Sequence, residues 1–593
     1  MSFAQPRPSR RSHAHSALGL AALLLLSAWA SSAPAQGLPT PYAPTGEEVQ
    51  IAAEALPEQA DAAIAEGQRL EAAGQWADAV AHYEQALRDY PSDRRLERRF
   101  DLARLHSNLE RRYADTSFLD TLAELNPSSA LDIHAELLSK IESHYVVTPP
   151  WERLTRRGAT AVLVASSEPA FAGHHGVRPS EAQRKAFANE VRRRFSSAGP
   201  IRNAREALRL TADLSRLAQR RFGAPAAVWT MEFVAAAAGG LDHYSSFLTP
   251  GQLRDVYSQI EGNFVGLGIE LKADGGALQI VRVIPGSPAD RAGIAAGDRI
   301  TAVDGQQTAD LSTDEAASLL TGEEGSIAEV TVVGPTPLPE GSTDVAHLVA
   351  KPPVRELRVR REHVEVPSLE GAKIVDEDYG VAYLRIPVFQ KSTSRDIEAA
   401  LWDLHRAGMR TLVIDLRGNP GGLLTSSVEL ADKFIAQGNL VSTRGRSDGE
   451  DFDYRAHRAG TWRVPLVVLI DGDSASASEI FAAAIRDNHR GSIVGERSFG
   501  KGSVQGIFPM TRGGAGVRLT TAKFFSPNGH PISKVGVNPD IVVRHATSVA
   551  GGQEEQRVAG YRGVSTGADS TAPAGDLALS RAIKAARQQA AMR

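Results

Sequence analysis

Four short runs of apolar residues lie between residues 380 and 496, and amphipathic stretches separate several of them. The runs are GVAYLRI, TLVIDLR, PLVVLID and SIVGE. The stretches Ser394–Arg406 and Ser426–Ile435 between them have helical spacing. Continuous apolar strands that alternate with helices are typical of a largely parallel sheet that is buried on both faces. The sequence therefore predicts an α/β domain over residues 363–545.

Residues 1–35 have the pattern of a cleaved signal peptide. Arginines near the N-terminus precede the uncharged, mostly apolar stretch Ala17–Ala30, and Ala33-Pro34-Ala35 supplies a small-x-small cleavage site. The apolar stretch is shorter than the roughly 20 residues that cross a bilayer. We expect an exported chain, in the periplasm or outside the cell, with no membrane span once the signal is removed.

The composition excludes several classes of chemistry. The 593 residues include no cysteine, so disulfides, thiolate catalysis and thiolate metal sites are excluded. The 70 acidic residues slightly outnumber the 66 basic ones, which gives no support to nucleic-acid binding. We predict no cofactor and no metal site.

Residues 47–235 are rich in Ala, Arg, Glu and Leu, with apolar residues at helical spacing. Within them, GQWADAVAHYEQALRDYP has the spacing of the second half of a tetratricopeptide repeat. The marker residues are Trp76, Tyr83 and Pro91, and a weaker copy follows with Tyr113 and Pro127. Two interpretations stay open: a repeat surface that binds a partner peptide, and an amphipathic helical domain that packs on its neighbour.

The stretch SSEPAFAGHHGVRPSEA, residues 166–182, is predicted to be a loop within this helical region. His174 and His175 have no carboxylate and no third ligand at a useful spacing. We therefore expect an exposed pair of histidines and not a metal site.

The segment IDGDSASASEIFAAAIRDN, residues 470–488, starts a predicted helix with three serines at alternate positions. One interpretation is a helix cap, because Ser476 and Glu479 have the spacing of a capping box. The other is a nucleophile at a helix N-terminus, where free amides and the helix dipole stabilise negative charge. These residues alone leave both interpretations open.

Two further segments at strand ends have residues suited to acyl transfer. In DLRGNPGGLL, Gly421 and Gly422 leave backbone amides unobstructed, as a site for an oxyanion requires. In ERSFGKGSVQG, Lys501 lies between two glycines, and a period of two residues turns Gln505 to the same side as the lysine. Gln505 could then orient the lysine amine.

Between residues 256 and 362 the pattern changes to short strands and turns, and three segments resemble a PDZ domain of the bacterial type. They are the loop of Phe264, Val265, Gly266, Leu267, Gly268 and Ile269, the helix start GSPADRAGI, and Gly297-Asp298-Arg299-Ile300. A glycine-rich turn exposes backbone amides to a carboxylate, and the strand edge beside it accepts an added strand. The resemblance implies that this loop binds the C-terminus of a peptide.

The full set of segments resembles the C-terminal processing (tail-specific) serine proteases over about residues 240–545. The set consists of LDHYSSFLTP, the PDZ segments, DLRGNPGGLL, SASASEI, GERSFGKGSVQ and TTAKFFSPNGHPISKVGVNPDI. The resemblance implies that Ser476 is the nucleophile, Lys501 the general base and Gln505 its supporting residue. It also implies an oxyanion hole made by the amides of Ala477 and of either Gly421 or Gly422. Asp471-Gly472-Asp473 and Ser498 depart from the common pattern of the family without touching the reacting groups.

The expected fold is a multidomain α/β chain with a helical, tetratricopeptide-like N-terminal region, a PDZ domain and a crotonase/ClpP-like α/β catalytic core. The expected boundaries are 1–35 for the signal, 36–130 for the repeat-like region, 131–255 for the helical N-terminal part of the protease, 256–362 for the PDZ domain, 363–545 for the catalytic domain and 546–593 for a C-terminal tail with a helix.

The resemblance implies an endopeptidase that cleaves unfolded or tail-marked proteins through an acyl-enzyme. Lys501 must be neutral to accept a proton, so burial must lower its pKa from the usual value of about 10.4. Its partners would be protein or peptide substrates with free, apolar C-termini. The PDZ domain would recognise those termini or gate activity. The N-terminal helices would select substrates, recruit an adaptor or build a homo-oligomer.

Three alternatives compete with this interpretation. A Ser-His-Asp triad would use His489 or His530 as base, although both fit exposed loop positions better. A second alternative is a catalytically silent scaffold of PDZ domain and repeats, and the intact Ser476, Lys501 and Gln505 argue against it. A hydratase or isomerase of the crotonase type would need an acyl-CoA site and carboxylate catalysts, which no motif supplies.

Overall fold

The computed structural model describes residues 60–274, 277–308, 319–334, 353–457, 460–543 and 576–591. The features discussed below belong to residues 63–593, which form one compact unit. The predicted signal peptide and most of the predicted C-terminal tail lie outside the described residues.

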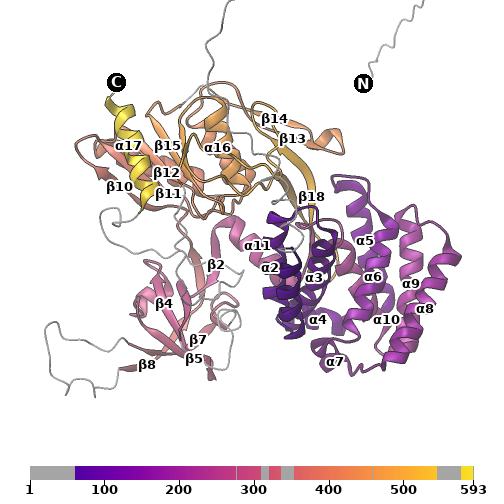
Figure 1. The fold of residues 1–593 in the computed structure, drawn as a ribbon. Coiled ribbons are helices and arrows are strands. Elements are labelled where there is room, and N and C mark those ends of the chain that lie inside the picture. Colours follow the sequence, from indigo (N-terminus) through magenta and orange to yellow (C-terminus); the bar gives the residue numbers. More distant parts are fainter. Residues whose placement is uncertain are drawn as a thin grey trace, which may run out of the picture. The chain divides into compact units, whose positions relative to one another are not determined.

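The N-terminal region is helical, as predicted, and its helices have distinct boundary signals. The helices are α2 (Trp76–Asp89), α3 (Arg94–Ala114), α4 (Thr116–Glu124), α5 (Pro127–His144), α6 (Trp151–Ala165), α7 (Pro169–His175), α8 (Glu181–Ala198), α9 (Ala204–Phe222) and α10 (Ala226–Gly239). Asp93, Asn126 and Ser180 cap helices with side-chain oxygens from extended backbone positions. Figure 1 shows these helices side by side in indigo and purple.

Helix α10 is the centre of this region because every one of its 14 residues is buried. Its hydrophobic residues share a core with the helices that precede it in sequence, from Leu109 to Phe222. The same core includes Val517 and Leu519 of a strand near the end of the chain. The helical region is therefore packed continuously onto the catalytic domain, across the predicted boundary at residue 130.

The prediction of a loop over residues 166–182 is wrong for the central part of this segment. Residues Pro169–His175 form helix α7, with proline in its first turn and Gly176 in the left-handed conformation at its end. Within this helix, His174 is exposed and His175 is half-buried, and both rings lie against Tyr113. The histidines are thus part of an aromatic contact between helices.

A short connection leads from α10 to the PDZ domain through β1 (Ser246–Leu248), α11 (Pro250–Glu261) and β2 (Asn263–Gly266). The domain comprises β3 (Ile269–Asp274), β4 (Ala277–Val283), α12 (Pro288–Arg291), β5 (Arg299–Val303), β6 (Gln306–Gln307), β7 (Ile327–Val333) and β8 (Val354–Arg360), and β9 (Glu362–Glu365) pairs with β2. The sheet order is β3-β4-β5-β7-β8, with β6 beside β5. Strand β3, which follows the predicted peptide-binding loop, is therefore an edge strand of this sheet.

The catalytic domain contains two sheets. Its elements are β10 (Glu370–Asp376), β11 (Val381–Arg385), α14 (Thr393–Arg406), β12 (Thr411–Asp415), α15 (Leu424–Asp432), β13 (Asn439–Gly445), η3 (Asp448–Glu450), β14 (Phe452–Arg455), β15 (Leu466–Ile470), α16 (Ala477–Asp487), β16 (Ser492–Gly495), β17 (Ser503–Pro509), β18 (Gly516–Phe525) and β19 (Ile541–Val542). The first sheet has the order β10-β11-β12-β15-β16-β19, and only β10 is antiparallel to its neighbour. This confirms the predicted, largely parallel sheet.

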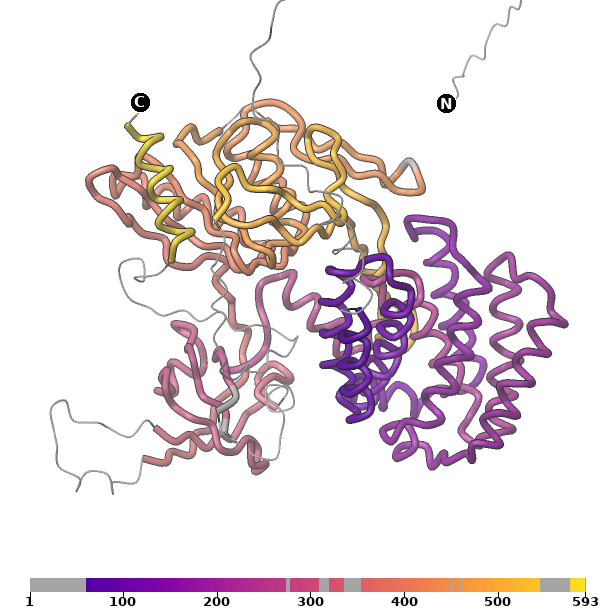
Figure 2. The backbone as a smooth tube through the Cα atoms, viewed as in Figure 1, coloured from indigo at the N-terminus to yellow at the C-terminus, as the bar shows by residue number. Residues whose placement is uncertain are grey.

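Both faces of the parallel sheet are covered. Helices α14, α15 and α16 pack on one face through residues such as Leu401, Leu430 and Phe481. The C-terminal helix α17 (Leu577–Ala591) covers the other face. Figure 2 shows this helix, in yellow, running along the catalytic domain. Burial on both faces explains why the strands are continuously apolar.

The second sheet is antiparallel, with the order β1-β18-β13-β14 and β17 beside β18. It pairs Ser246–Leu248 with residues 516–518, which are about half the chain away in sequence. This sheet was not predicted, because no local pattern reports a pairing between segments so far apart.

Among the described residues, no helix is both long enough and apolar enough to cross a bilayer.

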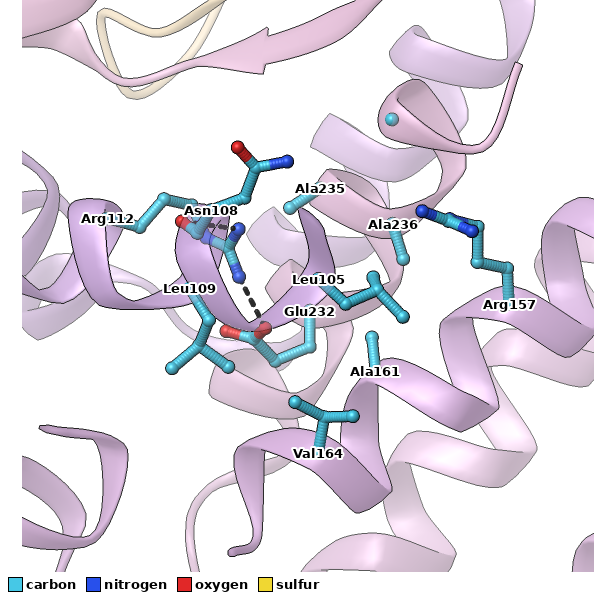
Figure 3. A pocket seen from close by; sticks show the side chains of 11 residues that line it. Leu105, Asn108, Leu109, Arg112, Arg157, Ala161, Val164, Glu232, Ala235 and Ala236 are labelled. Carbon is cyan, nitrogen blue, oxygen red and sulfur yellow. Dashed lines mark hydrogen bonds and ion pairs between the residues drawn. The ribbon is translucent and has the colours of Figure 1, made fainter. Parts of the chain in front are cut away.

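A buried ion pair holds α3 to α10 within the helical core. Arg112 Nη2 donates to Glu232 Oε2 at 2.6 Å, and the Tyr113 hydroxyl donates to the other oxygen at 3.2 Å. Burial raises the pKa of Glu232, while Arg112 and Tyr113 act in the opposite direction. Figure 3 shows the pair beside a cavity of about 20 Å³, enough for about one water molecule.

Replacing Glu232 by alanine leaves the buried Arg112 guanidinium without its carboxylate. We expect the free energy of unfolding of the helical core to fall by about 3–5 kcal/mol. Glu232→Gln retains an oxygen acceptor and should cost less. Urea unfolding followed by circular dichroism measures both variants. A Glu232→Ala protein as stable as the parent would contradict the importance assigned to this pair.

Candidate active site

The three loops selected from the sequence leave neighbouring strands at the same edge of the parallel sheet. Strand β12 leads into the glycine loop (residues 418–422), β15 leads into the serine turn (residues 471–476), and β16 leads into the lysine loop (residues 496–502). Strand β15 lies between the other two, and all three run parallel. Their carboxyl ends therefore lie together, where open α/β sheets place their binding sites.

Only the middle serine of the run is accessible. Ser474 and Ser478 are fully buried, and their hydroxyls donate to the carbonyls of Leu416 at 2.8 Å and Asn419 at 3.1 Å. Ser476 is partly exposed between them. The two outer serines thus attach the serine turn to the glycine loop, and Ser476 is the one that a substrate can reach.

The backbone of Ser476 differs from that of an ordinary helix cap. Its φ and ψ are 55° and −111°, whereas the capping residues Asp93 and Thr249 have extended backbones. This region is sparsely populated for residues with a side chain, and such strain gathers at functional sites. A serine on a sharp turn between strand and helix is how other hydrolases expose a nucleophile. Ser476 thus makes the predicted capping contact with Glu479 from a strained turn and not from the extended backbone of an ordinary cap.

The glycine loop touches the serine turn so closely that side chains are excluded. A Cβ at Gly421, where φ is 111°, would lie 2.7 Å from Ser476 Cβ. A Cβ at Gly422, where φ is 130°, would lie 2.1 Å from the carbonyl oxygen of Phe389. Both glycines are therefore required by close approach and by backbone conformation.

Asn419 fixes the shape of the glycine loop. Its side chain is buried, with Nδ2 donating to the carbonyl of Ile386 at 2.8 Å and Oδ1 accepting from the Gly421 amide at 2.8 Å. Its carbonyl accepts from the Ala475 amide at 3.0 Å. Asn419 thus joins the glycine loop to the serine turn, a role that its place in DLRGNPGGLL did not reveal.

Glu479 joins the serine turn to the lysine loop. Its buried Oε2 accepts from the amides of Ser476 and Lys501, both at 2.8 Å. Its Oε1 accepts from the Ser498 hydroxyl and the Gly500 amide, both at 2.6 Å. Burial raises the pKa of Glu479, and these four hydrogen bonds oppose the rise. Sequence reasoning found the capping half of this role and missed the contact with the lysine loop.

The shared oxygen of Glu479 keeps the backbones of Ser476 and Lys501 within two hydrogen-bond lengths of each other. The glycines that flank the lysine allow the loop to pass close to the chain behind it. A Cβ at Gly502 would lie 2.2 Å from the Ser533 amide nitrogen, and one at Gly500 would lie 3.1 Å from the carbonyl carbon of Lys534. The FGKG pattern is thus a consequence of close packing.

The surroundings of Lys501 lower its pKa to about 8, first through burial and then through the positive charge of Arg518, with Glu479 opposing. The amine lies 5.2 Å from the centre of the Tyr244 ring. Tyr244 comes from LDHYSSFLTP, and its carbonyl accepts from Arg518 Nε at 3.2 Å. Sequence reasoning quoted that segment without assigning it a role at the site.

Gln505 lies near the lysine loop, but its hydrogen bonds are made to residues other than the lysine. Within the described residues, Gln505 Nε2 donates to Ser503 Oγ at 2.9 Å and to Thr520 Oγ1 at 3.5 Å. The predicted contact between Gln505 and the lysine amine is not among these interactions.

The residues considered as alternative bases or as metal ligands do not form a similar cluster at this edge of the sheet. His489 and His530 are both exposed. The described residues contain no cluster of three or more His, Asp or Glu side chains placed to hold a metal ion.

The helical region borders the site. The Arg88 guanidinium, near the end of α2, lies 4.4 Å from the centre of the Phe499 ring in the lysine loop. Glu84, one turn earlier, is one of the charges that raise the pKa of Tyr244, after the larger effect of burial. The repeat-like helix therefore lies against the same segments that surround Lys501.

Comparisons with known proteins identify the family of two parts of this chain. Residues 380–543 match Peptidase family S41, and residues 279–334 match a PDZ domain. The carboxy-terminal-processing protease of Bartonella bacilliformis is 36% identical over 308 residues, which are 51% of this chain and 67% of that protein. The carboxyl-terminal-processing protease of a Picosynechococcus species is 36% identical over 306 residues, or 51% of this chain and 70% of that protein.

A solved structure is also similar, that of a photosystem II D1 C-terminal processing protease. It is 25% identical and covers 70% of this chain and 93% of its own, with a TM-score of 0.37.

The chain belongs to the carboxyl-terminal-processing proteases of peptidase family S41, and it is a serine-type endopeptidase. The predicted family, the PDZ domain and the multidomain fold class are confirmed.

The pKa of Lys501 can be measured directly. We expect the rate of Lys501 acetylation by acetic anhydride, followed by mass spectrometry, to reach half its maximum near pH 8, because the neutral amine is the reactive form. Arg518→Gln removes a nearby positive charge and should move this midpoint to higher pH. The unfolded chain, with an ordinary lysine pKa of about 10.4, is the reference. A midpoint near the unfolded value in the folded protein would contradict the described environment.

Proposed function

We propose that this protein cleaves unfolded or tail-marked proteins with a Ser-Lys dyad, in which Ser476 is the nucleophile and Lys501 the general base. The observation that carries the proposal is the accessible, strained Ser476 held to the lysine loop by the buried Glu479 carboxylate. Neutral Lys501 takes the Ser476 proton, and the alkoxide attacks the peptide carbonyl. The protonated amine then gives its proton to the leaving nitrogen, and water hydrolyses the acyl-enzyme.

A pKa of about 8 suits this role, because a base works best when its pKa lies near the working pH. The lysine is neutral above that pH and protonated below it. Turnover should therefore rise with pH, reach half its maximum near pH 8 and level off about one pH unit higher. Gln505 takes a supporting part through Ser503, next to the lysine loop, and not through a direct contact in this structure.

The oxyanion would lie at the start of α16, where the Ala477 amide and the helix dipole favour negative charge. The Gly421 amide already donates to Asn419 Oδ1. Among the contacts of the described residues, the Gly422 amide makes no such bond. We therefore assign the second donor to Gly422 in place of the open choice between the two glycines.

The dyad predicts that Ser476→Ala and Lys501→Ala each abolish cleavage of an unfolded reporter protein, by roughly three orders of magnitude or more. The double variant should be no worse, because both residues serve one step. Lys501→Arg should be as damaging, because a guanidinium does not deprotonate. His489→Ala and His530→Ala are the controls and should retain activity. An active Lys501→Ala, or an inactive histidine variant that is folded, would contradict the dyad.

The PDZ domain would select substrates by their C-termini. The predicted binding loop is two strand ends joined by Leu267 and Gly268: Phe264, Val265 and Gly266 belong to β2, and Ile269 begins β3, which is an edge strand and can accept an added strand. Leu267 is buried in the domain core, with its carbonyl bonded to the Ala289 amide, so the contact with the peptide falls to the backbone of the loop and to Ile269. An apolar tail with a free carboxylate fits such a site.

Tail recognition predicts different cleavage rates for peptides that differ only at the C-terminus. Amidation removes the carboxylate charge and should raise KM by the equivalent of a lost charge-assisted hydrogen bond, roughly 1.5–3 kcal/mol. A tail that ends in Asp should be cleaved as poorly, because its side-chain carboxylate would be desolvated. Equal rates for free, amidated and acidic tails would contradict recognition by this domain.

The location and partners complete the proposal. The signal-like residues 1–35 support export to the periplasm, where unfolded and tail-marked proteins would be the substrates. The repeat-like helices would bind an adaptor or a second copy of the chain. Because α2 touches Phe499, such a partner would dock next to the active site.

A further inference from the structure

The C-terminal helix α17 is bound to the parallel sheet along its whole length. One face of the helix, which includes Ala578, Ala582 and Ala586, packs on strands β11, β12, β15 and β16 (Figure 1). At its far end, Arg587 forms an ion pair with Asp376, and Gln589 Nε2 donates to Ser492 Oγ at 3.1 Å. These contacts attach the helix to strands β10 and β16 of the sheet.

The near end of the helix makes a different contact, to the residue that precedes the glycine loop. Asp576 receives two parallel hydrogen bonds from Arg417, with Nη1 to Oδ1 at 3.0 Å and Nη2 to Oδ2 at 2.9 Å. The planar, bidentate arrangement fixes both the distance and the orientation of the guanidinium. Asp576 also caps α17, because Oδ1 accepts from the Leu579 amide at 2.9 Å.

The same guanidinium binds Asp415, the last residue of β12. Arg417 Nε donates to both carboxylate oxygens, at 3.0 and 3.1 Å, and the Tyr383 hydroxyl donates to Asp415 at 3.0 Å. Asp415 is 1% exposed, so this charge is paired inside the protein. Arg417 is thus held between a buried carboxylate on the strand and a carboxylate on the terminal helix.

Arg417 leads directly into the glycine loop. Its carbonyl accepts from Arg385 Nη2 at 3.3 Å, and the next amide, that of Gly418, donates to Asp471 of the serine turn. Four residues later the loop reaches Gly421, which touches Ser476. Only a few residues of chain therefore separate the Arg417 side chain from the contact between Gly421 and Ser476.

We propose that Asp576 is a positioning residue of the active site, which orients the glycine loop through Arg417 and makes the C-terminal helix part of the catalytic machinery. The inference rests on the proposed oxyanion role of the glycine loop. With Asp415 as its only carboxylate, the guanidinium would have no fixed partner on the side that faces the terminal helix. Asp576 supplies that partner. The helix itself stays docked without Asp576, because its apolar face and its far end hold it to the sheet.

Asp576→Asn tests this proposal, because asparagine caps helices as well as aspartate does but lacks the charge and the second oxygen. We expect kcat for an unfolded reporter to fall about ten- to a hundredfold, as misplacement of catalytic groups by a fraction of an ångström to an ångström does, with KM within about twofold of the parent. Asp576→Glu retains the carboxylate and should recover part of kcat.

Arg587→Gln is the matched control, since it breaks an ion pair at the other end of the same helix. Its melting temperature is measured beside that of Asp576→Asn, and its kcat should stay near that of the parent. Parental kcat in Asp576→Asn, or equal losses of kcat in Asp576→Asn and Arg587→Gln, would overturn the positioning role. Ser476→Ala measured in parallel separates the two ideas: turnover by that variant contradicts the proposed nucleophile, whatever the Asp576 variants do.

Discussion

The arrangement of the site depends on the hydrogen bonds that the buried carboxylate of Glu479 accepts. A carboxylate with no access to water is costly unless hydrogen bonds replace its hydration. Here two amides of the lysine loop, one amide of the serine turn and one hydroxyl fill its lone pairs. Because each donor belongs to a segment that must lie close to Ser476, the need to satisfy Glu479 fixes the relative position of Ser476 and Lys501. The same negative charge opposes, without cancelling, the fall in the Lys501 pKa.

Three sets of contacts hold the segments of the site in place around Glu479. The serine turn and the glycine loop share hydrogen bonds through Asn419 and the two buried serines. Two contacts bring other segments to the lysine loop: the Tyr244 ring, just before β1, lies against Lys501, and Arg88 of helix α2 lies over the Phe499 ring. On the opposite face of the sheet, α17 reaches the glycine loop through Arg417. Segments from most of the chain thus meet at one edge of a parallel sheet.

The sequence predicted those parts of the site that lie in short, local patterns. The glycine loop, the serine run and the FGKG segment each follow an apolar strand, so their convergence follows from the parallel sheet. The boundaries of α7 were also available, in Pro169 and Gly176, but the small and polar residues around them favoured a loop. The antiparallel sheet, the ring of Tyr244 and the Asp576 contact were not predictable, because they join segments far apart in sequence. Gln505 shows the limit of strand alternation, which predicts the side of a residue but not its hydrogen-bond partner.

The central claim, that Ser476 carries the acyl group, is tested most directly by trapping the acyl-enzyme. The protein is mixed with an activated peptide ester, quenched in acid within the first turnover, digested and analysed by mass spectrometry. The account predicts a single acyl group on Ser476 in the parent protein and none in Ser476→Ala. An acyl group on Ser474 or Ser478, or turnover without any acylated serine, would contradict it.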